Sequence, residues 1–262
     1  MKKNIGICAG ITDFEDIRNI KEIGFDFVET SFSGLAKTEQ SVIDESADLF
    51  KELGLPCVSM NCLIVGDFVM VGEKADHAKI KEHIESTLEK TKKLGTKNFV
   101  MGSGRARSVP EGYPREKALE QLRELVGNVL APAAAKYGAV IAIEELRKEE
   151  CNMFVTCKET VQFIKELNVS NVKLLVDYYH AMLGGDTLGE IASYGDYISH
   201  VHIASPSNKR MIPLPGDGDD YGAFFAALDK AGYKAGNISL EGSAGDNRNE
   251  NLKTSLEYLR TL

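Results

Sequence analysis

Eight short apolar runs alternate with eight helical stretches along the 262 residues of the chain. Each run is too short for a stable helix and is rich in β-branched or other apolar residues, so we predict a buried strand at each. The predicted strands cover residues 4–10 (NIGICAG), 25–32 (FDFVETSF), 57–64 (CVSMNCLI), 98–104 (NFVMGSG), 139–146 (AVIAIEEL), 172–180 (VKLLVDYYH), 198–204 (ISHVHIA) and 237–242 (NISLEG). The predicted helices end near residues 24, 54, 94, 137, 167, 194, 231 and 259.

The order of these elements predicts the fold class. Strands that alternate with helices imply right-handed crossovers and a parallel sheet. Eight strand–helix units in 262 residues match a closed (β/α)8 TIM barrel of the α/β class. The alternative, an open doubly wound sheet, needs a glycine-rich phosphate-binding loop after its first strand, and the segment CAGITDF has no GxGxxG pattern. No linker divides the chain, so we expect one domain over residues 1–262.

Composition narrows the functional classes. With 43% hydrophobic residues the chain can bury a large core, yet no window approaches 18 uninterrupted apolar residues, so we expect no membrane span. The first apolar run is too short for a signal peptide, and five cysteines without a CxxC spacing indicate reduced thiols. We therefore expect a cytoplasmic protein. The net charge of −8 opposes sequence-independent binding to nucleic acid, although it does not exclude a local basic patch.

Polar residues stand at the carboxyl ends of most of the predicted strands. Active sites of (β/α)8 barrels lie at these ends. The last four strands each end in one residue that can bind a metal: Glu144, Asp177, His202 and Glu241. Neighbouring parallel strands are about 4.8 Å apart, so these side chains converge. Three carboxylates that close together repel one another, and a divalent cation would remove the conflict. Three oxygen ligands and one nitrogen suit Mn²⁺, Mg²⁺ or Co²⁺ better than a metal that prefers thiolate.

Each of these residues also has a structural interpretation. Glu144 or Asp177 could cap the next helix, Glu241 could pair with an arginine, and His202 could be a buried core histidine. The alternation along a strand points His200 to the same side as His202 but one layer deeper, so we expect a structural role for it, bonded to a buried carboxylate. Glu145 faces the helix layer by the same alternation. The earlier strands end in Glu29, Asn61 and Ser103, to which we assign no role.

Several of these segments resemble the sugar isomerase/epimerase family with the xylose-isomerase-like barrel, and ketose 3-epimerases in particular. They are MGSGRARSVPEGY, IAIEELRKEECNMF, VDYYH, HVHIAS and ISLEG. The resemblance implies one divalent metal ion, Mn²⁺ first and Mg²⁺, Co²⁺ or Zn²⁺ as alternatives. It assigns this ion to Glu144, Asp177, His202 and Glu241.

The resemblance also implies a sugar site. It assigns substrate contacts to Glu150 and His180 and expects a basic residue in the loop after the seventh strand, where this chain offers Lys209 and Arg210. The chain departs from the family by placing Glu145 where a proline is usual. We treat Arg105 and Arg107, in the loop after the fourth strand, as solvated charge. Asp219 or Asp220 is expected to cap the helix after the loop 216–220.

The expected activity is epimerisation of a ketose, or its phosphate, next to the carbonyl. Glu144 and Glu241 would act on opposite faces of the carbon, one removing a proton to give an enediolate and the other returning a proton. The same site could serve a keto-polyol dehydratase, and a two-metal aldose–ketose isomerase is a weaker alternative. The non-enzymatic alternative is a barrel that binds a sugar without catalysis. Homo-oligomerisation is a separate expectation. A zinc endonuclease is disfavoured, because His77 and His83 fall on a predicted helix rather than at strand ends.

Overall fold

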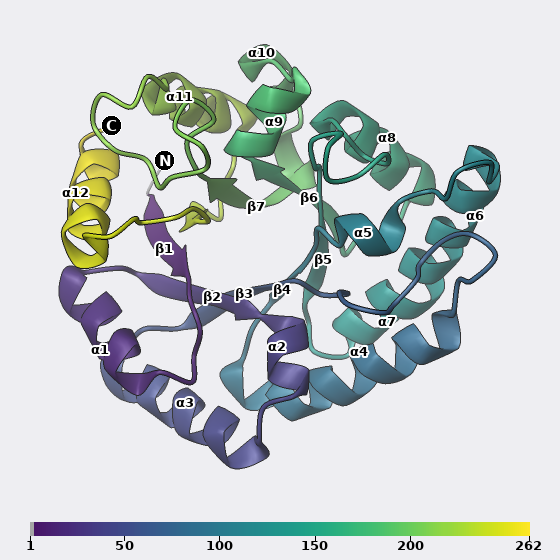
Figure 1. Cartoon of the computed structure of the whole chain (residues 1–262), viewed down its shortest axis with the longest axis horizontal. Helices are drawn as coiled ribbons and strands as arrows, with labels where there is room; N and C mark the ends of the chain where they lie inside the picture. The colour runs from purple at the N-terminus through teal and green to yellow at the C-terminus, as the bar shows by residue number, and fades with distance from the viewer. Residues whose placement is uncertain (1–2) are drawn as a thin grey trace.

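Eight parallel strands form a closed barrel in the order β1-β2-β3-β4-β5-β6-β7-β8 in the computed structural model, which describes residues 3–262. The predicted (β/α)8 barrel is confirmed, and the helices surround the strands (Figure 1). The strands are β1 Asn4–Cys8, β2 Phe27–Ser31, β3 Cys57–Asn61, β4 Asn98–Met101, β5 Val140–Glu144, β6 Val172–Asp177, β7 Ile198–Ile203 and β8 Asn237–Leu240.

The helices follow the predicted positions, with additions. The α-helices are α1 Phe14–Ile23, α2 Phe32–Ala36, α3 Gln40–Leu53, α4 His77–Thr91, α5 Gly104–Arg107, α6 Arg115–Leu125, α7 Ala131–Ala135, α8 Cys157–Leu167, α9 Tyr178–Gly184, α10 Leu188–Ile191, α11 Tyr221–Ala231 and α12 Arg248–Thr261. The 3₁₀ turns are η1 Lys92–Leu94 and η3 Gly195–Tyr197, and the π-helical η2 Val126–Leu130 joins α6 to α7. The short helices α2, α5 and α9 were not predicted; they lie at the carboxyl ends of β2, β4 and β6.

Side chains and glycines fix the ends of the longer helices. Asp13, Asp76 and Asp220 each accept a hydrogen bond from a backbone N–H in the first turn of α1, α4 and α11. Asp220 is therefore the cap of α11, whereas Asp219 accepts from Ser205 and Ser207 in the loop before it. Gly24 ends α1 with φ of 108°, a left-handed conformation that favours glycine.

The barrel interior is apolar on one side and polar on the other. Val100, Ala142 and Leu175, on β4, β5 and β6, form a fully buried cluster of their own. Side chains of His200 on β7 and Ser239 on β8 are also fully buried. Side chains two residues apart on a strand point to the same side. These five buried residues therefore form a layer directly beneath the residues at the carboxyl ends of the same strands.

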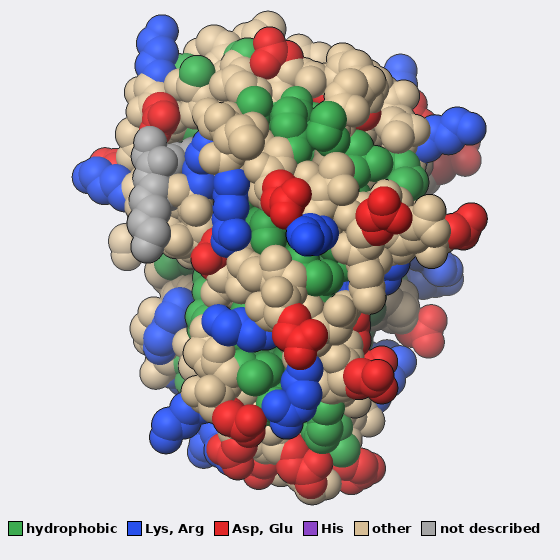
Figure 2. All heavy atoms as spheres, turned by 90° about the vertical axis from the view of Figure 1, so that its left-hand side faces the viewer, with side chains coloured by type: hydrophobic (Ala, Val, Ile, Leu, Met, Phe, Trp, Pro, Cys, Tyr) green, Lys and Arg blue, Asp and Glu red, His purple; other side chains and the backbone are tan. Residues whose placement is uncertain are grey.

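The outer surface carries both charge signs. Acidic and basic side chains are interspersed on the face drawn in Figure 2. No helix within residues 3–262 combines the length and the apolar character that crossing a membrane requires.

Candidate active site

The four residues predicted as metal ligands meet at the carboxyl ends of β5 to β8. One ligand atom from each of Glu144, Asp177, His202 and Glu241 lies within 4.8 Å of the others. The Nδ1 atom of His202 lies 3.3 Å from Glu144 Oε1 and 3.3 Å from Glu241 Oε2. The strand register explains this closeness, since Asp177 pairs with His202 and the chain leaves β8 at Glu241. We call these four residues the acidic cluster.

Burial gives the acidic cluster unusual electrostatics. Burial, reinforced by the charge of Glu241, raises the pKa of Asp177 to about 6, and burial likewise raises the pKa of Glu144. Burial alone would also raise the pKa of Glu241, but the charges of His202 and Arg210 lower it to about 2. The site therefore holds more carboxylates than its own cations balance.

Asp177 combines both roles considered from the sequence. Its Oδ1 atom caps α9 by accepting hydrogen bonds from the backbone N–H groups of Tyr179 and His180, at 2.8 and 3.4 Å. Its Oδ2 atom is buried and has no hydrogen-bond partner within the described part of the chain. A buried carboxylate oxygen without a partner is costly unless a cation or a ligand meets it. The donor set and this oxygen without a hydrogen bond fit a divalent cation bound by the acidic cluster.

Glu29, on β2, lies beneath His202. Its carboxylate accepts from His202 Nε2 at 2.9 Å, His200 Nε2 at 2.7 Å and Ser239 Oγ at 2.6 Å. Although burial opposes it, the two imidazoles hold the pKa of Glu29 well below its usual range. The charges of Glu29 and Glu241 raise the pKa of His202 against the effect of burial. The predicted bond between His200 and a buried carboxylate is confirmed, whereas the role of Glu29 was not foreseen.

Arg107, in α5, holds the backbone of Glu144. The expectation that Arg107 is solvated charge is wrong, because its side chain is fully buried. Its guanidinium donates to the backbone carbonyls of Met101 at 2.9 Å and Glu144 at 2.7 Å, which ties β4 to β5. α5 follows β4, and the side chain of Arg107 is buried against the ends of β4 and β5. Gly102 completes the support, since a Cβ atom there would collide with Oε2 of Glu144.

Glu145 points away from the acidic cluster, as predicted. Its Oε1 atom accepts a hydrogen bond from the backbone N–H of Asp177 at 2.8 Å. Burial, reinforced by the charges of Asp177 and Asp186, raises the pKa of Glu145 well above its ordinary value. The side chain therefore fixes the start of α9 from the helix side.

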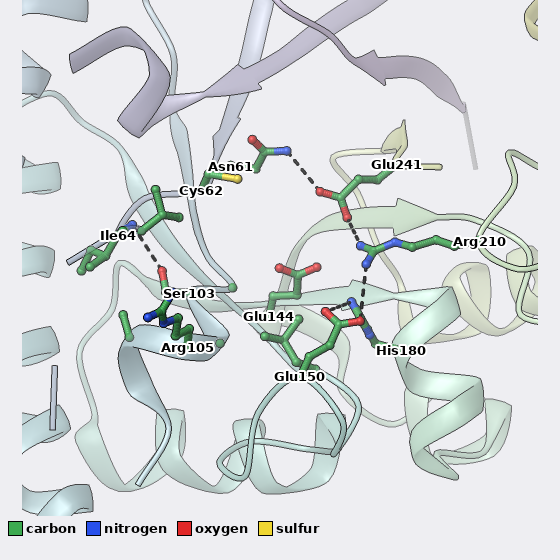
Figure 3. A pocket seen from close by; sticks show the side chains of 16 residues that line it. Asn61, Cys62, Ile64, Ser103, Arg105, Glu144, Glu150, His180, Arg210 and Glu241 are labelled. Atoms are coloured by element: carbon green, nitrogen blue, oxygen red, sulfur yellow. Dashed lines mark hydrogen bonds and ion pairs between the residues drawn. The ribbon is translucent and has the colours of Figure 1, made fainter. Parts of the chain in front are cut away.

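A cleft of about 340 Å³ opens above the acidic cluster (Figure 3). Glu150, His180 and Arg210, three of the residues expected to contact substrate, line this cleft. Lys209, the fourth, is exposed and is not among the residues that line it. Asn61, at the end of β3, also faces the cleft and donates to Glu241 Oε1 at 3.2 Å.

The polar groups around the cleft have defined directions. The Nδ1 atom of His180 accepts from the backbone N–H of Arg147 at 3.4 Å, so Nε2 carries the proton. Nε2 lies 3.8 Å from Asp177 Oδ2 and has no hydrogen-bond partner among residues 3–262. Burial lowers the pKa of His180, which favours the neutral ring. This imidazole therefore presents a free N–H to the cleft.

Arg210 is the cation of the cleft. Its Nη2 atom donates to Glu241 Oε2 at 2.7 Å and lies 3.8 Å from Asp177 Oδ2, while its Nη1 atom lies 3.7 Å from Glu150 Oε1. The guanidinium also lies over the ring of Tyr179, 5.0 Å from its centroid. Arg210 thus partly neutralises the acidic cluster from its open side.

The histidines that an endonuclease site would need lie elsewhere. His77 Nε2 and His83 Nε2 are within hydrogen-bond distance of the backbone carbonyls of Met70 and Leu63, at 2.9 and 3.2 Å. Both histidines belong to α4, on the predicted helix. Neither is part of a group of potential metal ligands within the described range.

Known proteins share this architecture. The family model described as Xylose isomerase-like TIM barrel matches residues 17–262. A 3-dehydro-D-guloside 4-epimerase of Escherichia coli (strain K12) is 31% identical over 94% of this chain and 94% of that protein. A D-psicose 3-epimerase of Agrobacterium fabrum is 28% identical over 77% of this chain and 69% of its own length. The apo crystal structure of 3-keto-D-glucoside 4-epimerase from E. coli aligns over 100% of both chains, with a TM-score of 0.81 at 26% identity. The chain therefore belongs to the xylose isomerase-like TIM barrel family, as its resemblance to sugar isomerases and epimerases implied.

Proposed function

We propose that this protein is a metal-dependent sugar epimerase that inverts a carbon next to a carbonyl group. The observation that carries the proposal is the acidic cluster, in which two glutamates from different elements reach one buried imidazole within 3.3 Å. The relatives are named epimerases, and the family is one of sugar isomerases and epimerases, so the protein is an enzyme of the isomerase class.

The acidic cluster would hold one divalent cation through Glu144, Asp177, His202 and Glu241. We propose Mn²⁺ because three oxygen donors and one imidazole suit it. When bound, such a cation would polarise a sugar carbonyl and increase the acidity of the adjoining C–H.

Glu144 and Glu241 would carry the protons. They enter the cleft from different directions, Glu144 from β5 and Glu241 from the segment after β8 (Figure 3). One carboxylate removes the proton beside the carbonyl to give an enediolate, and the other returns a proton to the opposite face. Inversion requires two acid–base groups on two faces, which we propose these two positions supply.

Three further side chains would orient the sugar. The free Nε2–H of His180 would donate to a substrate oxygen, and Glu150 would accept from a hydroxyl. Arg210 would hold the more distant hydroxyls, because it already reaches across the cleft to Glu150 and Glu241. We assign this role to Arg210 rather than Lys209.

The names of the relatives indicate the substrate class. A 3-dehydro-D-guloside is a glycoside with a keto group at carbon 3 of its sugar ring, whereas psicose is a free ketose, and in both names the epimerised carbon adjoins the carbonyl. We propose a keto sugar or a keto-glycoside as the substrate of this chain.

Isotope exchange tests the proposal. The wild-type protein, saturated with Mn²⁺ and incubated in D₂O with a panel of keto sugars and keto-glycosides, should place deuterium at the inverted carbon. Glu144→Gln and Glu241→Gln should each lower kcat at least about 100-fold, the usual loss on removal of a general acid or base. Glu149→Gln is the matched control, since Glu149 is exposed in the same loop as Glu150.

Product analysis by NMR separates the alternatives. An epimer containing solvent deuterium supports the proposal. Loss of water from the substrate would instead identify a dehydratase, and the absence of deuterium from every substrate, with Mn²⁺ shown to be bound, would contradict proton transfer. Metal content must be measured for each variant, because both glutamates belong to the acidic cluster.

A further inference from the structure

A second cavity of about 510 Å³ adjoins the cleft of the active site. It lies between the segment after β3 and the segment after β4, and Arg105 lines both cavities. Figure 3 shows Arg105 beside Ser103, on the side of the cleft away from Arg210. We call this second cavity the outer groove. The proposed chemistry does not use it.

The two walls of the outer groove are fixed to each other. The backbone N–H of Met70 donates to the carbonyl of Ala106 at 2.8 Å. Gln121 binds both polar groups of the Gly72 backbone, at 2.7 and 3.1 Å. Pro110 packs so closely on Gly72 that an added Cβ would lie 2.7 Å from its ring. The groove is therefore a preformed feature of the fold.

The lining of the outer groove suits a neutral, hydroxyl-rich ligand. Glu73 and Glu111 line it together with Lys74 and Arg105, so the formal charges cancel and neither an anion nor a cation is favoured. These four side chains are exposed and offer both donors and acceptors. A sugar ring, whose hydroxyls donate and accept, can use both kinds of group.

Tyr113 adds an aromatic surface to the outer groove. The side chain is half-buried, and its hydroxyl has no hydrogen-bond partner within residues 3–262. Tyrosine combines an apolar body with a polar tip, which matches the apolar C–H face and the hydroxyl edge of a sugar. Arg105 likewise has no hydrogen bond or ion pair among the described residues, although it stands where the two cavities meet.

The volumes argue for a ligand with two parts. The cleft above the acidic cluster, about 340 Å³, lies near the lower end of the roughly 300–1,000 Å³ range of ligand pockets. We propose that the outer groove is a second sugar subsite, which binds the other ring of a keto-glycoside whose keto ring lies in the cleft. This inference rests on the proposed epimerase function and specifies its substrate as a disaccharide or a similar glycoside. Arg105 would donate to oxygens near the glycosidic bond.

Two substrates that share one keto ring test the subsite. Methyl 3-keto-D-glucoside fills only the cleft, whereas cellobiose oxidised to the 3-keto form in its non-reducing ring also reaches the outer groove. With the Mn²⁺-saturated wild-type protein, kcat/KM for the disaccharide should exceed that for the methyl glycoside about tenfold.

Variants of the outer groove should affect only the larger substrate. Tyr113→Ala should lower kcat/KM for the disaccharide about tenfold and leave the methyl glycoside within twofold. Glu73→Ala combined with Lys74→Ala should act in the same direction, and it keeps the test valid if Tyr113→Ala fails to fold, because both side chains are exposed. Arg18→Ala, on the exposed face of α1, is the control and should change neither value.

The outcomes separate the two proposals. Equal kcat/KM values for the two substrates in the wild type, or equal losses on both in the groove variants, would overturn the second subsite and leave the epimerase function standing. A wild-type protein that turns over neither substrate and no member of the keto-sugar panel would overturn the epimerase function, and the subsite with it.

Discussion

Replacement of Glu29 by glutamine tests whether the hydrogen bonds beneath His202 control the proposed metal site. The carboxylate of Glu29 accepts from His202, His200 and Ser239, at 2.9, 2.7 and 2.6 Å. Glutamine keeps the size but offers one oxygen in place of two, so at least one of the three donors loses its acceptor. If His202 loses it, the tautomer protonated at Nδ1 becomes competitive, and that nitrogen faces Glu144 and Glu241.

The expected magnitude follows from this geometry. Removal of the group that orients a metal-binding histidine typically costs about 10- to 100-fold in metal affinity. This loss corresponds to about 1.4–2.7 kcal/mol at roughly 1.36 kcal/mol per factor of ten. A buried donor left without an acceptor costs about 1–3 kcal/mol more, which appears as a lower free energy of unfolding in the metal-free protein.

The assay is titration of the metal-free protein with Mn²⁺ by isothermal calorimetry, with circular dichroism to show that the variant is folded. Ser239→Ala is the matched control, because it removes one donor to Glu29 and leaves both imidazoles bonded. We expect its Mn²⁺ affinity to stay within threefold of the wild type. A folded Glu29→Gln protein with unchanged Mn²⁺ affinity would refute the reasoning that Glu29 orients His202.

Four further substitutions give distinct expectations. Gly102→Ala should lower kcat at least tenfold with little change in melting temperature, because the new methyl displaces the flexible carboxylate of Glu144 rather than backbone. Arg107→Met should lower the free energy of unfolding by about 2–4 kcal/mol, measured by urea denaturation, since two buried carbonyls lose their donor. Arg210→Met should raise KM for sugar yet not weaken Mn²⁺ binding measured by calorimetry, because it removes a cation next to the acidic cluster. Burial raises the pKa of Glu145, so the folded state keeps a proton that the unfolded state loses as pH rises above about 4.5. The contribution of Glu145 to stability therefore falls as pH rises. Between pH 5 and pH 8, the melting temperature of Glu145→Gln should rise relative to that of the wild type.

The acidic cluster was predictable from the sequence because barrel geometry converts order along the chain into position. Each of its four members stands at the carboxyl end of a strand, and consecutive parallel strands are neighbours in a barrel. The strand at whose end a residue stands therefore gives the position of that residue around the barrel. The same argument placed His200 one layer below His202, since side chains alternate along β7.

Glu29 and Arg107 needed information that strand order does not contain. Glu29 belongs to β2, and its bond to His202 on β7 crosses the barrel interior between strands that do not pair. Arg107 belongs to the four-residue helix α5, which is too short to leave a periodic pattern. Its two carbonyl partners carry no sequence signature, because every residue has a carbonyl. In each case a tertiary contact determines the role of the residue.

Charge balance connects the parts of the site. Glu29, Glu144 and Asp177 are buried carboxylates and Glu241 is a partly buried one, while His202 and Arg210 are the basic groups among them. The pKa values of Glu144, Asp177 and His202 are all raised, which favours the retention of protons by these groups when no metal is bound. A divalent cation needs those same atoms deprotonated, so its binding must release protons and weaken as the pH falls. Glu29 is the exception, because its pKa is depressed and it stays charged. We therefore expect Glu29 to accept the Nε2–H of His202 in either state, which would leave Nδ1 as the atom that exchanges a proton for the proposed metal.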